Sequence, residues 1–169
     1  YYENLLDIDR RARALAHEHL LACIDFAASV GTPYVGTFIG RDVSLDVSQN
    51  LDLARGILPR FVDYAGERGI EIIIENCPME GWHPDGYPAN LAYSPELWEW
   101  MFDLGLFLNF DPSHLVWLGI DPVRALVPYV DRVRHVQAKD TQRDLSARDR
   151  FGSYGKMIGR GKLVARGKP

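Results

Sequence analysis

The chain has 169 residues, 47% of them hydrophobic and 25% charged, which is the composition of an ordinary soluble protein and allows one domain with a hydrophobic core. Two cysteines without a Cys-x-x-Cys spacing exclude a disulfide framework. No signal peptide and no apolar run of about 18 residues are visible, which predicts a cytoplasmic protein with no membrane partner. The net charge of −4 divides into −10 over residues 1–140 and +6 over residues 141–169, and the acidic body argues against a nucleic-acid partner.

A long helix is predicted first. Asp7 and Asp9 are candidate N-caps of a helix that continues to about Val30. His17 and His19 lie within this helix, away from any strand end, and are interpreted as one exposed and one packed residue rather than as metal ligands. Its apolar side is expected to contain the residues that recur at helical spacing: Leu15, His19, Ala22 and Phe26.

The next predicted elements lead to a carboxylate at a strand end. A strand is expected over residues 33–38, and a helix over about 48–68 that kinks at Pro59. Residues 70–75 then contain three consecutive isoleucines, the most β-prone run in the sequence. Glu75 therefore sits at the carboxyl end of a short buried strand, the place where ligands collect in parallel α/β folds.

The second half of the chain repeats this pattern after a long loop. The loop, residues 76–93, is rich in glycine, proline and aromatic residues, and connections of this length are usually functional or disordered. Four further elements are predicted after it: a helix over residues 94–105 with Ser94 as its cap, a strand over 106–111 ending in Asp111, a short helix over 121–130 capped by Asp121, and a strand over 133–137.

The order of elements places the chain in the α/β class. Strands that alternate with helices pair in parallel through right-handed crossovers. About four such units make either half of an eight-stranded (β/α) barrel or a small open doubly wound sheet. No Gly-x-Gly-x-x-Gly or Walker loop follows a predicted strand, which weakens the case for a nucleotide-binding doubly wound sheet. Residues 1–141 are expected to form this unit, and residues 142–169 a basic, glycine-rich tail that is variable or disordered.

Three strand ends carry polar groups that can converge, because the carboxyl ends of parallel strands point the same way. These groups are Glu75, Asp111 and the pair His135 and Gln137, which share a face two residues apart. His114 can swing over the same site if a helical turn begins after Asp111. This set suits a divalent cation, either Mn²⁺, Mg²⁺ or Co²⁺ bound mainly by oxygen or Zn²⁺ in a mixed site.

Simpler interpretations exist for the same residues. Asp111 followed by Pro112 has the pattern of a helix N-cap, as at Ser94 and Asp121. His135 alone is more often a hydrogen-bonded core histidine than a ligand. The coincidence of three polar strand ends in one parallel series favours the functional interpretation.

The sequence resembles a known family, the sugar phosphate isomerases and epimerases with a xylose-isomerase-like TIM barrel. The most specific pieces are Ile-Glu-Asn-Cys-Pro at 74–78 and Asp-Pro-Ser-His-Leu at 111–115, at this separation. The resemblance implies a partial (β/α)8 barrel with a divalent metal site. The matching stretches are residues 2–7, 35–42, 74–79, 109–115 and 135–141.

The resemblance also implies roles for individual residues. Glu75 would be a metal ligand and the catalytic acid/base, Asp111 a metal ligand, and His114 a contact to metal or substrate. Gln137 stands where the family has the second histidine of a His-x-His pair, so it would be a metal ligand through oxygen. The remaining expected substrate contacts are His135, Lys139 and Trp82, although Trp82, like His83 and Tyr87 in the same loop, is more often simply packed.

By this resemblance the chain lacks strands 1–2 and 7–8 of the barrel, and the family's second acid/base glutamate would lie beyond residue 169. The open sheet edges of a half-barrel favour pairing with another chain, so a homo-oligomer is possible. The expected activity of the intact protein is isomerisation or epimerisation of a sugar or sugar phosphate by proton transfer through an enediolate. Alternatives are an inosose-dehydratase-like lyase, a less favoured endonuclease-IV-like phosphodiesterase, and a catalytically incomplete half-barrel.

Overall fold

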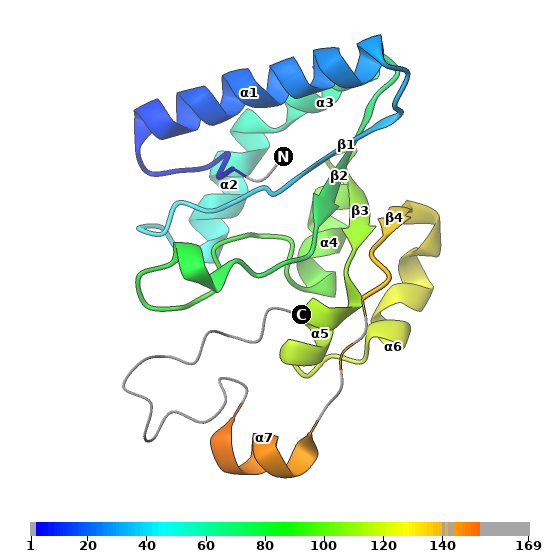
Figure 1. Cartoon of the computed structure of the whole chain (residues 1–169). Helices are drawn as coiled ribbons and strands as arrows, with labels where there is room; N and C mark the ends of the chain where they lie inside the picture. Colours follow the sequence, from blue (N-terminus) through cyan, green and yellow to red (C-terminus); the bar gives the residue numbers. More distant parts are fainter. Residues whose placement is uncertain (1–2, 140, 142–143, 153–169) are drawn as a thin grey trace.

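Four strands form one parallel sheet in the computed structural model, which describes residues 3–139, 141 and 144–152. The strand order is β1-β2-β3-β4, and at least one helix connects each strand to the next (Figure 1). The predicted α/β alternation and parallel pairing are therefore confirmed. The strands are β1 (Tyr34–Thr37), β2 (Glu71–Glu75), β3 (Phe107–Phe110) and β4 (Val133–Val136).

The helices begin where aspartate or proline prepares a first turn. Asp9 accepts hydrogen bonds from two backbone N–H groups at the start of α1, and Asp46 forms a reciprocal capping box with Gln49 at the start of α2. The described helices are α1 (Arg10–Ser29), α2 (Val47–Ile57), α3 (Pro59–Gly66), the 3₁₀ turn η1 (Glu80–Trp82), α4 (Pro95–Phe102), α5 (Pro112–Trp117), α6 (Pro122–Leu126), the 3₁₀ segment η2 (Val127–Arg132) and α7 (Leu145–Phe151).

Two expectations about the helices need correction. The helix predicted over 48–68 is two helices, because Pro59 lacks an N–H and begins α3. Ser94 occupies the N-cap position of α4, but its side chain makes no capping hydrogen bond, whereas Asp121 accepts two at the start of α6. The tail over residues 142–169, expected to be variable or disordered, stays a prediction: its described residues 144–152 contain α7, and residues 142–143 and 153–169 lie outside the described part.

The apolar side of α1 is also different from the one predicted. Leu15 and Phe26 are 57% and 68% exposed. The side chains that face β1 and α3 are one step away around the helix, and the predicted spacing was correct in period but wrong in phase. The buried residues of α1 are Ala16, Leu20, Ile24 and Ala27.

The two faces of the sheet have different roles, because successive side chains on a strand alternate. One face joins the hydrophobic core with the helices, through Val35, Ile72, Ile74, Leu108 and Phe110. The residues between them belong to the opposite face. In the register of the sheet, Glu75 pairs with Asn109 and Asn109 with His135, so three polar residues form one row across β2, β3 and β4.

In the described part of the chain, the outer strands β1 and β4 each pair with one neighbour only. Exposed apolar side chains occur on α1 and on β4, for example Phe26 and Val136. These edges are consistent with the predicted self-association, which stays a prediction. No helix among the described residues is both long and apolar enough to cross a membrane.

A close backbone contact fixes the loop that precedes α1 against the end of β1. Gly40 has φ +81°, and a Cβ placed there would lie 1.8 Å from the Asn4 side-chain oxygen. That oxygen accepts hydrogen bonds from the backbone N–H groups of Leu6 and Arg41. Glycine at position 40 therefore allows the Asn4 side chain to hold two segments together.

We expect Gly40→Ala to lower the free energy of unfolding by about 2–4 kcal/mol more than Gly31→Ala does, through overpacking and lost hydrogen bonds. Gly31 is a matched control, because its φ is +73° but no atom lies within 4 Å of the position that a Cβ would take there. Both variants carry the left-handed backbone cost, and only Gly40→Ala displaces Asn4. Chemical denaturation of both variants measures the difference, and equal losses would contradict the close contact.

Candidate active site

Asn76 joins the ends of β2 and β3 and so brings two carboxylates together. The Asp111 backbone N–H donates to the Asn76 side-chain oxygen at 2.7 Å, and the Asn76 amide donates to the Asp111 carbonyl at 2.9 Å. Asn76 is fully buried. Because Glu75 precedes it directly and ends β2, this two-point clamp fixes the strand end that carries Glu75 beside the one that carries Asp111.

Asp111 uses its two carboxylate oxygens for different purposes. Oδ1 accepts hydrogen bonds from the Ser113 N–H at 2.9 Å and the Ser113 hydroxyl at 2.6 Å, and so caps α5. Oδ2 lies 2.6 Å from Lys139 Nζ and 3.1 Å from His114 Nε2. The helix cap therefore occupies one oxygen, the other faces Lys139 and His114, and Asp111 is completely buried; its metal role stays a prediction.

His114 lies in the first turn of α5, which turns its ring back over the strand ends. Its Nε2 atom is 3.1 Å from Asp111 Oδ2 and 3.5 Å from Glu75 Oε1. Burial alone would lower the pKa of His114, but hydrogen bonds with Asp111, Cys77 and Glu75 outweigh it and raise the pKa to about 11. In the same way, burial would raise the pKa of Asp111, but hydrogen bonds from His114, Lys139 and Ser113 hold it well below its usual range.

Cys77 is a member of this group whose role was not predicted from the sequence. One potential ligand atom from each of Glu75, Cys77 and His114 lies within 4.8 Å of the other two. Metal sites built on cysteine are recognised in a sequence by paired cysteines, and a single cysteine gives no such signal. Its position two residues after Glu75 was the available clue, since alternate residues of an extended segment point to the same side.

The fourth strand contributes less directly. His135 is exposed, and its Nδ1 atom is 2.9 Å from the side-chain oxygen of Asn109, the neighbour in the polar row. The backbone N–H of Gln137 donates to the Phe110 carbonyl at 2.8 Å, and the described contacts of Gln137 involve its backbone. Glu75, Cys77, Asp111 and His114 are called the cluster below. Lys139 contacts Asp111, so of the residues predicted near β4 it is the one whose side chain contacts the cluster. The metal role of Gln137 stays a prediction.

Asn90 fixes the long loop to the strand ends, and it is a second residue whose role was not predicted from the sequence. Its side-chain oxygen accepts hydrogen bonds from the N–H groups of Ile39 and Gly40, and its amide donates to the carbonyls of Glu75 and Cys77. The loop is therefore ordered around a buried asparagine. The sequence could not reveal this, because all four partners are backbone groups.

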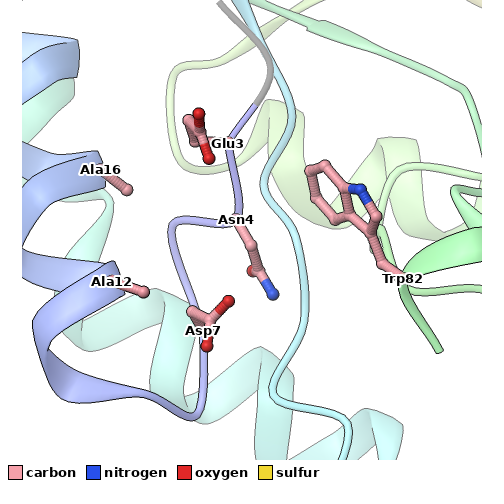
Figure 2. A pocket seen from close by; sticks show the side chains of 6 residues that line it. All are labelled: Glu3, Asn4, Asp7, Ala12, Ala16 and Trp82. Carbon is pink, nitrogen blue, oxygen red and sulfur yellow. The ribbon is translucent and has the colours of Figure 1, made fainter. Parts of the chain in front are cut away.

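The described contacts of Trp82 are with residues outside the cluster. Its ring packs edge-on against Phe38, with 5.6 Å between the centroids. Trp82 also lines a cavity of about 350 Å³, where Figure 2 shows it across from Asn4, Glu3 and Asp7. Two further rings of the loop, those of His83 and Tyr87, pack against each other. Packing thus accounts for these rings, and a substrate contact of Trp82 stays a prediction.

A comparison with family models matches residues 1–165 to the family described as xylose isomerase-like TIM barrel. The chain belongs to this family. Its partial barrel therefore consists of four of the family's parallel strands with their helices, as the sequence resemblance implied.

Solved structures show the same fold in sugar epimerases and a dehydratase. A D-tagatose 3-epimerase-like protein is 21% identical with a TM-score of 0.65, over 94% of this chain and 57% of that one. The probable 3-DHS dehydratase AsbF of Bacillus anthracis is 15% identical with a TM-score of 0.62, over 80% and 47%. The chain thus spans about half the length of these proteins. An uncharacterized protein YfiH of Bacillus subtilis (strain 168) is 38% identical over 68 residues, 37% of this chain and 22% of that protein.

Proposed function

We propose that this chain supplies the metal centre and one catalytic acid/base of a sugar or sugar phosphate isomerase or epimerase. The observation that carries the proposal is the convergence of Glu75, Asp111 and His114 at adjacent strand ends, with His114 Nε2 at 3.5 and 3.1 Å from the two carboxylates. The family's fold and its epimerase members support the same chemistry.

The residues present fit a divalent cation. Two buried carboxylates and an imidazole are ligands that Mn²⁺, Co²⁺ and Zn²⁺ accept. Lys139 balances the charge of Asp111 from the other side. We propose Glu75, Asp111 and His114 as ligands, with Gln137 as a further candidate. When bound, the ion would polarise a carbonyl or hydroxyl of the substrate.

The side chains of the chain have separate tasks in the proposed reaction. Glu75 removes a proton from the carbon beside the substrate carbonyl, which yields an enediolate, and return of a proton to the opposite face of that carbon needs a second acid/base outside this cluster. His114 and Lys139 surround Asp111 and hold its carboxylate in place. Asn90 joins the loop to the backbone carbonyls of Glu75 and Cys77 and so fixes the position of the strand end that carries the base. His135, Lys139 and Trp82 are proposed contacts to sugar hydroxyls, phosphate and ring carbons, respectively.

Asp111→Asn provides a test of the metal centre. The Asn oxygen can still cap α5, while the second oxygen and the charge are lost, so divalent-ion affinity should fall at least about 100-fold. Isothermal calorimetry with Mn²⁺, Co²⁺ and Zn²⁺ on the full-length protein measures it. Asp121→Asn is the matched control, because Asp121 also caps a helix before a proline but lies at an exposed position. No ion binding by the unmutated protein, or equal affinity in both variants, would refute the proposal.

A lyase is the second candidate. Elimination needs one base to remove a proton beside a carbonyl, whereas epimerisation needs removal and return. Within the described residues of the cluster, Asp111 is committed to the helix cap and Lys139, which leaves Glu75 as the base. The dehydratase with this fold is consistent with that chemistry. Product analysis with a ketose and a keto-inositol separates an isomerised sugar from a dehydrated product.

A further inference from the structure

The thiol of Cys77 lies at the proposed metal centre and not beside it. Cys77 is partly exposed, and its Sγ atom is within 4.8 Å of a Glu75 carboxylate oxygen and of a His114 ring nitrogen. Carboxylate, thiol and imidazole come here from the end of β2, from the residue two positions later and from the first turn of α5. Three different ligand types therefore converge from two separate segments of the chain.

The spacing of these atoms suits a small tetrahedral ion. Oxygen and nitrogen ligands at about 2.0–2.1 Å from a tetrahedral ion lie about 3.4 Å apart, and a sulfur at about 2.3 Å lies about 3.6 Å from them. Glu75 Oε1 and His114 Nε2 are already 3.5 Å apart. With the whole group inside 4.8 Å, side-chain movements of about 1 Å would complete the site.

A second sulfur lies next to the first. Cys77 Sγ is 3.5 Å from Met79 Sδ. Met79 has φ +51°, which makes it the one non-glycine residue with positive φ in the described part of the chain. This left-handed turn directs the chain so that a polarisable thioether contacts the thiol. Two polarisable sulfur atoms therefore lie at the cluster, which makes its ligand environment chemically softer than carboxylates alone would.

We propose that Cys77 is a ligand at this centre and that its sulfur makes the site selective for a thiophilic ion such as Zn²⁺ or Co²⁺ over Mg²⁺ and Mn²⁺. Thiolate favours borderline and soft ions, whereas Mg²⁺ and Mn²⁺ prefer oxygen. The inference rests on the proposed metal centre and specifies which ion it takes. In the sequence Glu-Asn-Cys at 75–77, Cys77 directly follows the clamp residue Asn76, and the proposal makes Cys77 the residue that determines which metal ion binds.

Cobalt spectroscopy tests this directly. The full-length protein, stripped with a chelator and titrated with Co²⁺, should show a thiolate-to-cobalt charge-transfer band in the near ultraviolet. Cys77→Ser should lose this band and keep the visible cobalt bands. Zn²⁺ affinity, measured by competition with a chromophoric chelator, should fall about tenfold or more, while Mn²⁺ affinity changes less than about threefold. Cys23→Ser is the matched control, since Cys23 is the other cysteine and packs on α1 against the core.

The outcomes separate the two proposals. Visible cobalt bands without a charge-transfer band in the unmutated protein would overturn the role of Cys77 and leave the metal centre standing. Binding of Mn²⁺ without binding of Co²⁺ or Zn²⁺ would overturn the role of Cys77 alone, and the absence of binding of all three ions would overturn both. Loss of the charge-transfer band in Cys23→Ser would also contradict the assignment. The spectrum of the unmutated protein decides the question even if Cys77→Ser does not fold.

Discussion

Replacing Glu75 by glutamine is expected to lower the turnover number of the full-length protein by about 10²–10⁴-fold, the usual contribution of a positioned general base. Glutamine has nearly the same size and can still contact His114 but cannot take up the substrate proton. Because Glu75 lies at a strand end held by Asn76 and Asn90, its backbone should stay in place. The melting temperature should therefore change by no more than about 5 °C.

Glu71→Gln is the matched control on the same strand. Glu71 begins β2, at the opposite end from Glu75, and pairs with Arg134 on β4 at 2.7 Å. Both side chains of that pair are partly exposed, so its loss should cost at most about 1 kcal/mol and leave turnover unchanged. Steady-state kinetics and thermal unfolding of the two variants give the comparison. Comparable turnover in both variants would mean that Glu75 is not the base.

The strand ends were predictable from the sequence because their signals are local. Three isoleucines before Glu75, and a largely apolar run before Asp111, place both carboxylates at the carboxyl ends of parallel strands. His114 followed from the helical turn that Pro112 begins. Residues whose position depends on their own segment could thus be placed without a structure.

The rest depends on contacts between distant segments. The buried side of α1 is decided by β1 and α3, and the helical period alone could not choose between Leu15 and Ala16. For Asp111, the sequence left a helix cap and a metal ligand open as alternatives. The structure shows Oδ1 in the helix cap and Oδ2 against Lys139 and His114, a division that requires the position of Lys139, 28 residues away. Cys77 likewise acquires neighbours only when α5 folds back.

Asn90 is the strongest example of a role that only the fold reveals. It is 1% exposed, and its side chain bonds the end of β1 to the end of β2, 50 and 15 residues away along the chain. A single amide satisfies two donors and two acceptors of the backbone. Buried backbone groups without hydrogen-bond partners are energetically costly, so Asn90 stabilises the segment after β1 and the chain around the end of β2, where Glu75 and Cys77 lie.

Asn90→Leu is therefore expected to reduce the free energy of unfolding by about 4 kcal/mol or more. The substitution leaves the N–H groups of Ile39 and Gly40 and the carbonyls of Glu75 and Cys77 without their partner, at about 1–3 kcal/mol for each group that water does not reach. Equilibrium denaturation measures the loss. Calorimetry should also show weaker ion binding, because the carbonyls that Asn90 holds belong to two proposed ligand residues.

Asn90→Asp separates the two halves of this contact. Aspartate has the shape of asparagine and keeps an oxygen for the Ile39 and Gly40 N–H groups, but it cannot donate to the carbonyls of Glu75 and Cys77. We expect it to lose about half as much stability as Asn90→Leu, and to weaken ion binding at least as much, since the lost bonds are the ones on the ligand side. A full-sized stability loss with unchanged ion affinity would show that Asn90 supports the fold without positioning the site.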